Sequence, residues 1–168
     1  MSIVRSVLAP STAIAAALLV AATTAAPAMA SGHSILREDL QGTFPLTDPV
    51  NASPVIAGVS PGGAPWVVAA GSKVRVREDG RITVDVKGLV IPGRVPGNPI
   101  SLMAASLVCD GMVIDSTQPF AVSPDGDGYI SDRISETDDD DCDYPVVLIR
   151  NATNPAALGA YFAFAADD

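Results

Sequence analysis

Apolar and charged residues alternate with a period of two over residues 73–77 and again over 82–87, which is the spacing of strands that bury one face. The intervening residues include Asp79-Gly80, a turn signal. A two-residue loop there would put the apolar residues of the two strands on opposite faces, whereas a three-residue loop, 78–80, puts them on one face. The resulting pairs are Val76 with Ile82, Val74 with Val84, and Lys73 with Asp85. The pattern therefore predicts a hairpin in which Gly80 takes the left-handed position of the turn.

A second hairpin is predicted at Asp110-Gly111, where a two-residue type I′ turn fits the flanking apolar residues. This turn makes Gly111 the second turn residue. The predicted faces are Leu107, Cys109, Met112 and Ile114 on one side, and Ser106, Val108, Val113 and Asp115 on the other.

Further short β-type runs follow at residues 120–123, 129–134, 144–150 and 160–165, separated by turn residues. Between the first two runs, a five-residue loop, 124–128, would pair Val122 with Ile130. No amphipathic helical pattern is evident. The chain is thus predicted to be all-β, an antiparallel two-sheet sandwich of about seven to nine short strands with one disulfide.

The first thirty residues differ from the rest. Arg5 is their only charge, an Ala-rich apolar stretch follows, and Ala28-Met29-Ala30 has the small residues of a signal-peptidase site. Residues 1–30 are therefore predicted to be a signal peptide, and the protein to be secreted, with no membrane insertion after cleavage. Residues 31–63 are rich in Pro, Gly, Ser and Asn, which predicts a flexible tail or linker. The sandwich domain is predicted at 64–168.

Charge is distributed unevenly along a chain whose net charge is −9. Residues 31–109 carry 7 basic and 6 acidic groups, whereas residues 110–168 carry 2 basic and 13 acidic groups, a net charge of −11. Nucleic-acid binding needs clustered Lys and Arg, so this balance argues against a nucleic-acid partner. A negative surface of this kind is also expected simply from the solubility needs of an exported protein.

Cys109 and Cys142 are the two cysteines of the chain. In an exported protein of this size they are predicted to form a disulfide that ties the second hairpin to the strand near residue 146. Two free thiols would be expected in the cytosol, and a metal site would need further ligands close to one of the cysteines.

Acidic residues form the candidate cation site. Asp125-Gly126-Asp127 reproduces the middle of a calcium-binding loop, but the positions of its first and last ligands are Ser123 and Ile134. A hairpin turn explains the same residues, so no dedicated cofactor is expected. A loose calcium site remains open as the weaker alternative if Asp125 and Asp127 lie near the acidic run. The run consists of Asp138, Asp139, Asp140 and Asp141.

No catalytic constellation emerges from the residues. Gly58-Val59-Ser60-Pro61-Gly62 matches a serine-hydrolase pattern, but Pro61 has no N–H to donate to an oxyanion, and the chain's one histidine, His33, lies in the predicted tail. A sugar-binding platform would need exposed aromatic side chains. The possible members are Trp66, Tyr129, Tyr144 and Tyr161, of which Trp66 begins an apolar run and is expected in the core.

From Gly62 to its end, the chain resembles a group of small uncharacterised secreted proteins of actinobacteria. The motifs that carry the resemblance are PGGAPWVV (61–68), DGRITV (79–84), LVCDG (107–111), SPDGD (123–127) and PVVLIRN (145–151). The resemblance implies export, a β fold and a disulfide, and no activity. The leading hypothesis is a non-enzymatic binding or structural domain at or outside the cell envelope, with an unknown partner that could be an envelope component. The alternative is a secreted hydrolase that uses carboxylates of the acidic half.

Overall fold

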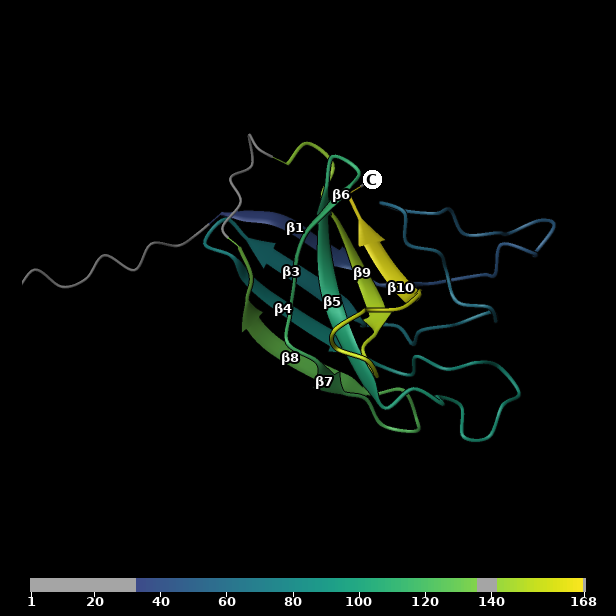
Figure 1. Cartoon of the computed structure of the whole chain (residues 1–168). Coiled ribbons are helices and arrows are strands. Elements are labelled where there is room, and N and C mark those ends of the chain that lie inside the picture. Colours follow the sequence, from purple (N-terminus) through teal and green to yellow (C-terminus); the bar gives the residue numbers. More distant parts are fainter. Residues whose placement is uncertain (1–32, 136–141, 168) are drawn as a thin grey trace, which may run out of the picture. The chain divides into compact units, whose positions relative to one another are not determined.

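A computed structural model (Figure 1) describes residues 33–135 and 142–167, which form ten β-strands and, within these ranges, no helix. The first five strands are β1 (Ser34–Asp39), β2 (Gln41–Gly42), β3 (Lys73–Arg77), β4 (Arg81–Val86) and β5 (Leu102–Cys109). The others are β6 (Met112–Ser116), β7 (Phe120–Ala121), β8 (Gly128–Arg133), β9 (Val146–Asn151) and β10 (Tyr161–Ala166). The predicted all-β class is confirmed. The number of strands exceeds the expected range because β1 and β2 lie within residues 31–63, which were predicted to form a tail.

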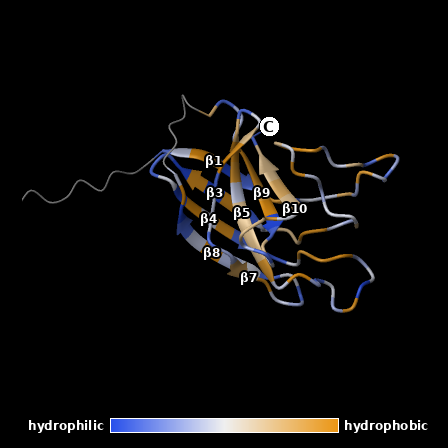
Figure 2. Ribbon diagram, viewed as in Figure 1, coloured by the Kyte–Doolittle hydropathy of each residue, from blue (hydrophilic) through white to orange (hydrophobic). Residues whose placement is uncertain are grey.

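The strands form two antiparallel sheets. The four-stranded sheet has the order β1-β3-β4-β8. The six-stranded sheet has the order β2-β10-β9-β5-β6, and its sixth strand, β7, pairs with the first residues of β5. The inner faces of both sheets supply one hydrophobic core, which includes Val74 and Val84 from the first sheet and Leu107 and Val147 from the second. Figure 2 shows this as alternating apolar and polar bands along β3 and β4. The predicted two-sheet sandwich is therefore confirmed.

The hairpin of β3 and β4 has the predicted register. Val76 faces Ile82, Val74 faces Val84, and Lys73 faces Asp85. Gly80 has a φ of +75°, and a Cβ on it would lie 2.2 Å from the carbonyl oxygen of Ile134. The position thus requires glycine for its conformation and for its close backbone neighbour.

The hairpin of β5 and β6 has the predicted turn, but its faces are partly different from the prediction. Asp110 and Gly111 both have positive φ, as a type I′ turn requires, and Cys109 faces Met112. One residue further along, Ile114 forms a β-bulge, so that Leu107 faces Asp115 instead of Ile114. The predicted grouping of Ile114 with Leu107 is wrong, because a bulge reverses the alternation beyond it.

The loop between β7 and β8 has the predicted length but begins one residue earlier. Residues 123–127 form the loop, and Val122 faces Gly128, not Ile130. The Ser123 N–H donates to the Asp127 carbonyl at 2.8 Å and closes the turn at this point. Ile130 instead faces Val84, because β8 belongs to the four-stranded sheet while β7 pairs with β5. The chain passes from one sheet to the other here, which overrides the simple hairpin.

The segment predicted as a flexible tail, 31–63, contributes to both sheets, so the predicted start of the domain at residue 64 is wrong. β1 pairs with β3 along the edge of the four-stranded sheet, and Leu36 is buried. Residues 54–60 pack Ile56 and Val59 against a second apolar cluster, formed by Val108, Leu148 and Tyr161. We refer to residues 54–60 as the strap. The predicted signal peptide, 1–30, lies outside the described residues and stays a prediction.

The predicted disulfide is present. Cys109 and Cys142 are joined, with their Cα atoms 5.0 Å apart, and both residues are buried. The bridge connects the end of β5 to the residues just before β9, which is its neighbour in the six-stranded sheet. A buried structural disulfide indicates folding in an oxidising, extracellular type of environment. Within the described ranges, no helix has the length and apolar character to cross a membrane.

Candidate functional site

The outer face of the four-stranded sheet gathers most of the basic side chains of this acidic protein. On β3 and β4 the buried residues alternate with solvent-facing ones, so the charged residues of both strands project from the same side. Seven of the chain's ten Lys and Arg residues lie on or beside this face. They are Arg37, Lys73, Arg75, Arg77, Arg81, Lys87 and Arg133, and we call this surface the basic face.

Two pairs of arginines on the basic face lie directly opposite each other on neighbouring strands. Arg37 of β1 faces Arg75 of β3, and Arg81 of β4 faces Arg133 of β8. Like charges in such cross-strand pairs destabilise a sheet. Arg133 approaches Asp79 at 3.9 Å, whereas Arg75 donates to the neutral Ser34 Oγ at 3.3 Å. Among the described residues no carboxylate lies within ion-pair distance of Arg37 or Arg75, so this pair concentrates positive charge.

One row of side chains crosses the sheet and ends on an aromatic ring. The register places Asp39, Lys73, Asp85 and Tyr129 side by side from β1 to β8. Tyr129 is 63% exposed, and its hydroxyl makes no hydrogen bond within the described part of the chain. A large exposed ring on a sheet face is the kind of side chain that binding surfaces use as an anchor.

Open depressions lie on both sides of Tyr129. One, of about 270 Å³, is lined by Arg37, Lys73 and Arg75 together with Tyr129 and Asp85. The other, of about 600 Å³, is lined by Lys87, Gly88 and Asp127, again together with Tyr129 and Asp85. Because both depressions share Tyr129 and Asp85, they adjoin each other on the sheet with these two residues between them, and we call the two depressions together the groove.

The far wall of this groove is fixed by backbone contacts. Gly126 has a φ of +87°, and a Cβ there would lie 2.3 Å from the Leu89 backbone nitrogen. Asp127 Oδ1 accepts a hydrogen bond of 2.9 Å from the Gly88 N–H. The loop between β7 and β8 is thereby held against the segment that follows β4, which defines the position of the wall beside Tyr129.

These contacts also bear on the predicted calcium residues. Asp125 is exposed on the loop, and Asp127 already accepts the Gly88 N–H. The other candidates, Asp138 to Asp141, lie outside the described residues. In the two described ranges, no group of three or more His, Cys, Asp or Glu side chains is arranged to hold a metal ion. Calcium binding therefore stays a prediction.

Of the four predicted aromatic candidates, two are buried and two exposed. Trp66 is buried as predicted and packs on Phe162 with ring centroids 4.4 Å apart, and Tyr161 is fully buried. Tyr144 is 77% exposed but follows the disulfide, on the six-stranded side of the molecule. Only Tyr129, among these four, lies on the basic face.

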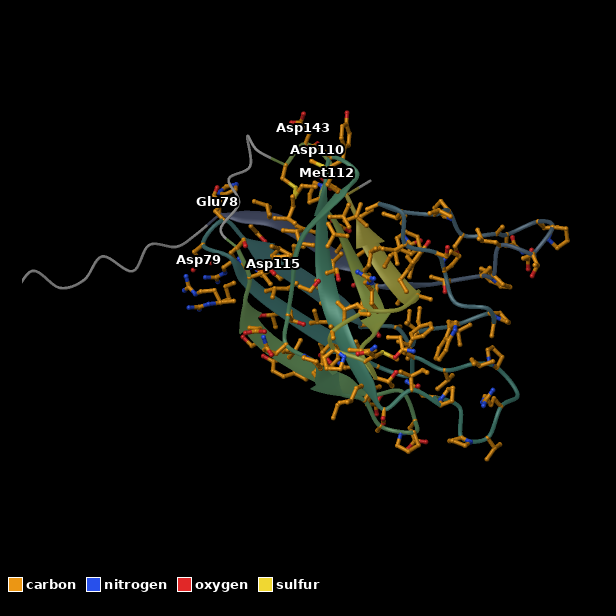
Figure 3. All side chains as sticks on the ribbon, viewed as in Figure 1. Glu78, Asp79, Asp110, Met112, Asp115 and Asp143 are labelled. Carbon is orange, nitrogen blue, oxygen red and sulfur yellow. A yellow bond between two sulfur atoms is a disulfide. The ribbon has the colours of Figure 1, made fainter. Side chains whose placement is uncertain are left out.

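The acidic side chains labelled in Figure 3 are distributed around the edges of the sandwich. Asp110 and Asp143 lie at the disulfide end, and Glu78 and Asp79 lie at the β3–β4 turn. Asp115, also labelled, accepts three hydrogen bonds. Desolvation acts to raise the pKa of its carboxyl, but hydrogen bonds from Ser116 N–H and from the N–H and hydroxyl of Ser135 outweigh this effect and lower the pKa. Asp115 thus stabilises the chain at Ser135 as an ionised acceptor.

The predicted hydrolase alternative needs two available carboxylates in one cleft. Asp85 and Asp127 do line the same depression. However, Asp85 pairs with Lys87 at 3.3 Å, and Asp127 holds the Gly88 N–H. These contacts occupy one oxygen of each carboxylate, and each is made to a donor, an ammonium group or an N–H, whereas an acid–base pair needs one carboxyl in an environment that keeps it protonated.

The basic face was not among the predicted sites. A signal was present, because Arg75 and Arg77 alternate with the buried valines of β3. The contributions of Arg37 and Arg133 depend on strand pairings that the sequence alone does not specify.

The fold and the face together define the class: a disulfide-bonded β-sandwich with one solvent-facing, positively charged sheet. In comparisons with known proteins, no family model, no curated protein and no solved structure matches the chain. The resemblance to secreted actinobacterial proteins therefore stays a prediction, and function has to be argued from the groove itself.

Proposed function

We propose that this protein is a secreted, non-enzymatic binding domain that acts at or outside the cell envelope and holds an anionic ligand on its basic face. The observation that carries the proposal is the facing pair Arg37 and Arg75, in a chain whose net charge is −9. Cross-strand arginines destabilise the sheet that contains them. An anionic ligand would neutralise them and offset that cost when bound.

An anionic ligand has to be reconciled with the net negative charge of the whole chain. The overall negative charge opposes polyanions at long range, but the field beyond about 10 Å is largely screened at ordinary ionic strength. At contact distance a ligand meets the local charge, which is positive between β1 and β3. The acidic half keeps its predicted role in solubility.

The test is retention of the protein, exported from its full-length reading frame, on two immobilised polyanions at low ionic strength. The polymers are polygalacturonate, a saccharide, and poly-L-glutamate, a peptide. We expect Arg37→Gln to weaken retention. Thermal stability should stay unchanged or rise slightly, because one of two positive charges that face each other is removed. Arg94→Gln is the matched control, since Arg94 is exposed in a loop and lines neither depression.

Equal retention of the Arg37→Gln and Arg94→Gln variants would show that only net charge matters. That result, or no retention of the unchanged protein on either polymer, would contradict the proposed function.

A further inference from the structure

The two sides of the groove differ in what they offer a ligand, and this difference narrows the ligand class. Arg37, Lys73 and Arg75 line one depression together with Asp85, whereas Asp85, Asp127 and Lys87 line the other. A ligand that carried only negative charge would gain little in the second depression, where two carboxylates stand against one ammonium group that Asp85 already pairs with. A ligand with both anionic groups and hydroxyl donors would match both, because hydroxyls donate to carboxylates.

Tyr129 adds a second requirement. Its exposed ring stands between the two depressions, both of which it lines, so a ligand lying along the groove must cross it. A pyranose ring has an apolar face of C–H groups and a polar rim of hydroxyls, which suits an aromatic ring beside polar side chains. The row from Asp39 to Tyr129 crosses four strands, about 14 Å, which suits an oligosaccharide better than a single sugar.

From these features we infer that the anionic ligand is an acidic polysaccharide, stacked on Tyr129 and held through its acid groups by Arg37, Lys73 and Arg75. This inference rests on the proposed function and specifies its ligand. A single-stranded nucleic acid would also stack on tyrosine, but such sites combine several aromatic rings with a continuous basic track. Here one ring shares its depressions with Asp85 and Asp127, and Asp39 stands at the other end of the same row. A phosphate backbone would have to pass these carboxylates.

The experiment compares the affinities of the exported protein for polygalacturonate, poly-L-glutamate and an oligothymidylate of similar charge. We expect polygalacturonate to bind most tightly. Tyr129→Ala should lower that affinity roughly fivefold to tenfold, the effect of losing one aromatic contact. The same variant should leave the weaker poly-L-glutamate binding unchanged, whereas Arg37→Gln should reduce binding of both polymers.

Two variants keep the result interpretable. Tyr129→Phe should bind like the unchanged protein, because the ring and not the hydroxyl makes the contact. Tyr144→Ala removes a similarly exposed tyrosine from the other side of the molecule and should have no effect. Circular dichroism of each variant checks that the fold is retained.

The outcomes separate the two proposals. If polygalacturonate and poly-L-glutamate bind equally and Tyr129→Ala changes neither, the polysaccharide inference is wrong and the anion-binding function stands. Tighter, Tyr129-dependent binding of oligothymidylate would overturn the inference in favour of a nucleic acid. Binding of none of the three polymers would overturn both proposals.

Discussion

In the four-stranded sheet, β3 and β4 alternate between buried valines or isoleucine and polar or charged side chains that face solvent. In the six-stranded sheet, by contrast, β5 is buried at seven of its eight positions. The strap contributes to this difference, because its Ile56 and Val59 pack against Val108 of β5, Leu148 of β9 and Tyr161 of β10. The four-stranded sheet therefore has an exposed outer face on which binding groups can be placed. The outer face of the six-stranded sheet is closed where the strap covers it. We expect substitutions in the two outer faces to have opposite consequences, affecting binding in one and stability in the other.

The largest effect on stability is expected from the disulfide, which connects two neighbouring parts of the six-stranded sheet. Its cysteines are 33 residues apart in sequence, and for a loop of that length the loss of chain-entropy restraint costs about 3–4 kcal/mol. The variant with both Cys109→Ala and Cys142→Ala should unfold at a correspondingly lower denaturant concentration. Equal midpoints for this variant and the unchanged protein would mean that burial alone stabilises the six-stranded sheet.

The contrast between the outer faces is tested by two truncations of side chains. Leu148 is fully buried under the strap, so Leu148→Ala should destabilise the protein by about 2–5 kcal/mol. Ser131 is exposed on β8, at the outer face of the other sheet, so Ser131→Ala should change stability by less than about 0.5 kcal/mol. Chemical denaturation measures both. Similar costs for the two variants would remove the distinction between an exposed outer face and a closed one.

A smaller, pH-dependent effect is expected from Tyr161 beneath the strap. Burial raises the pKa of its phenol to about 12, above its ordinary value of 10.0. The folded state therefore favours the neutral phenol over the phenolate. The stability that comes from this preference is complete below pH 10 and is lost as pH rises through the folded pKa. Absorbance titration of the protein should show a late tyrosine ionisation near the folded pKa, and Tyr161→Phe should abolish that late phase. A late phase that survives in this variant would assign it to another tyrosine.

The sequence was most informative where local turn chemistry and burial agree. The β3–β4 register follows from the parity of Val74 and Val76 with Ile82 and Val84, because only one loop length puts them on the same face. The Asp110-Gly111 turn is equally local. The cysteine pairing needed only the number of cysteines and the expected compartment.

The errors occur where distant parts of the chain decide the structure. The bulge at Ile114 brings Asp115 to Ser135, a contact between residues far apart in sequence. The strap has the composition of a linker, yet Ile56 and Val59 are needed to cover the six-stranded sheet. The mostly apolar run of β5, interrupted by Ser106, was an indirect sign that some other segment had to cover its outer side.

The early position of β1 and the strap has a consequence for handling the protein. A fragment shortened to begin at residue 64 would lack both segments. It would present the backbone edge of β3, whose partner β1 is missing, and the uncovered apolar surface around Leu148. Unpaired strand edges and apolar patches are templates for intermolecular association. Such a fragment is expected to precipitate or oligomerise, so the natural N-terminal segment serves this domain as a built-in safeguard against aggregation.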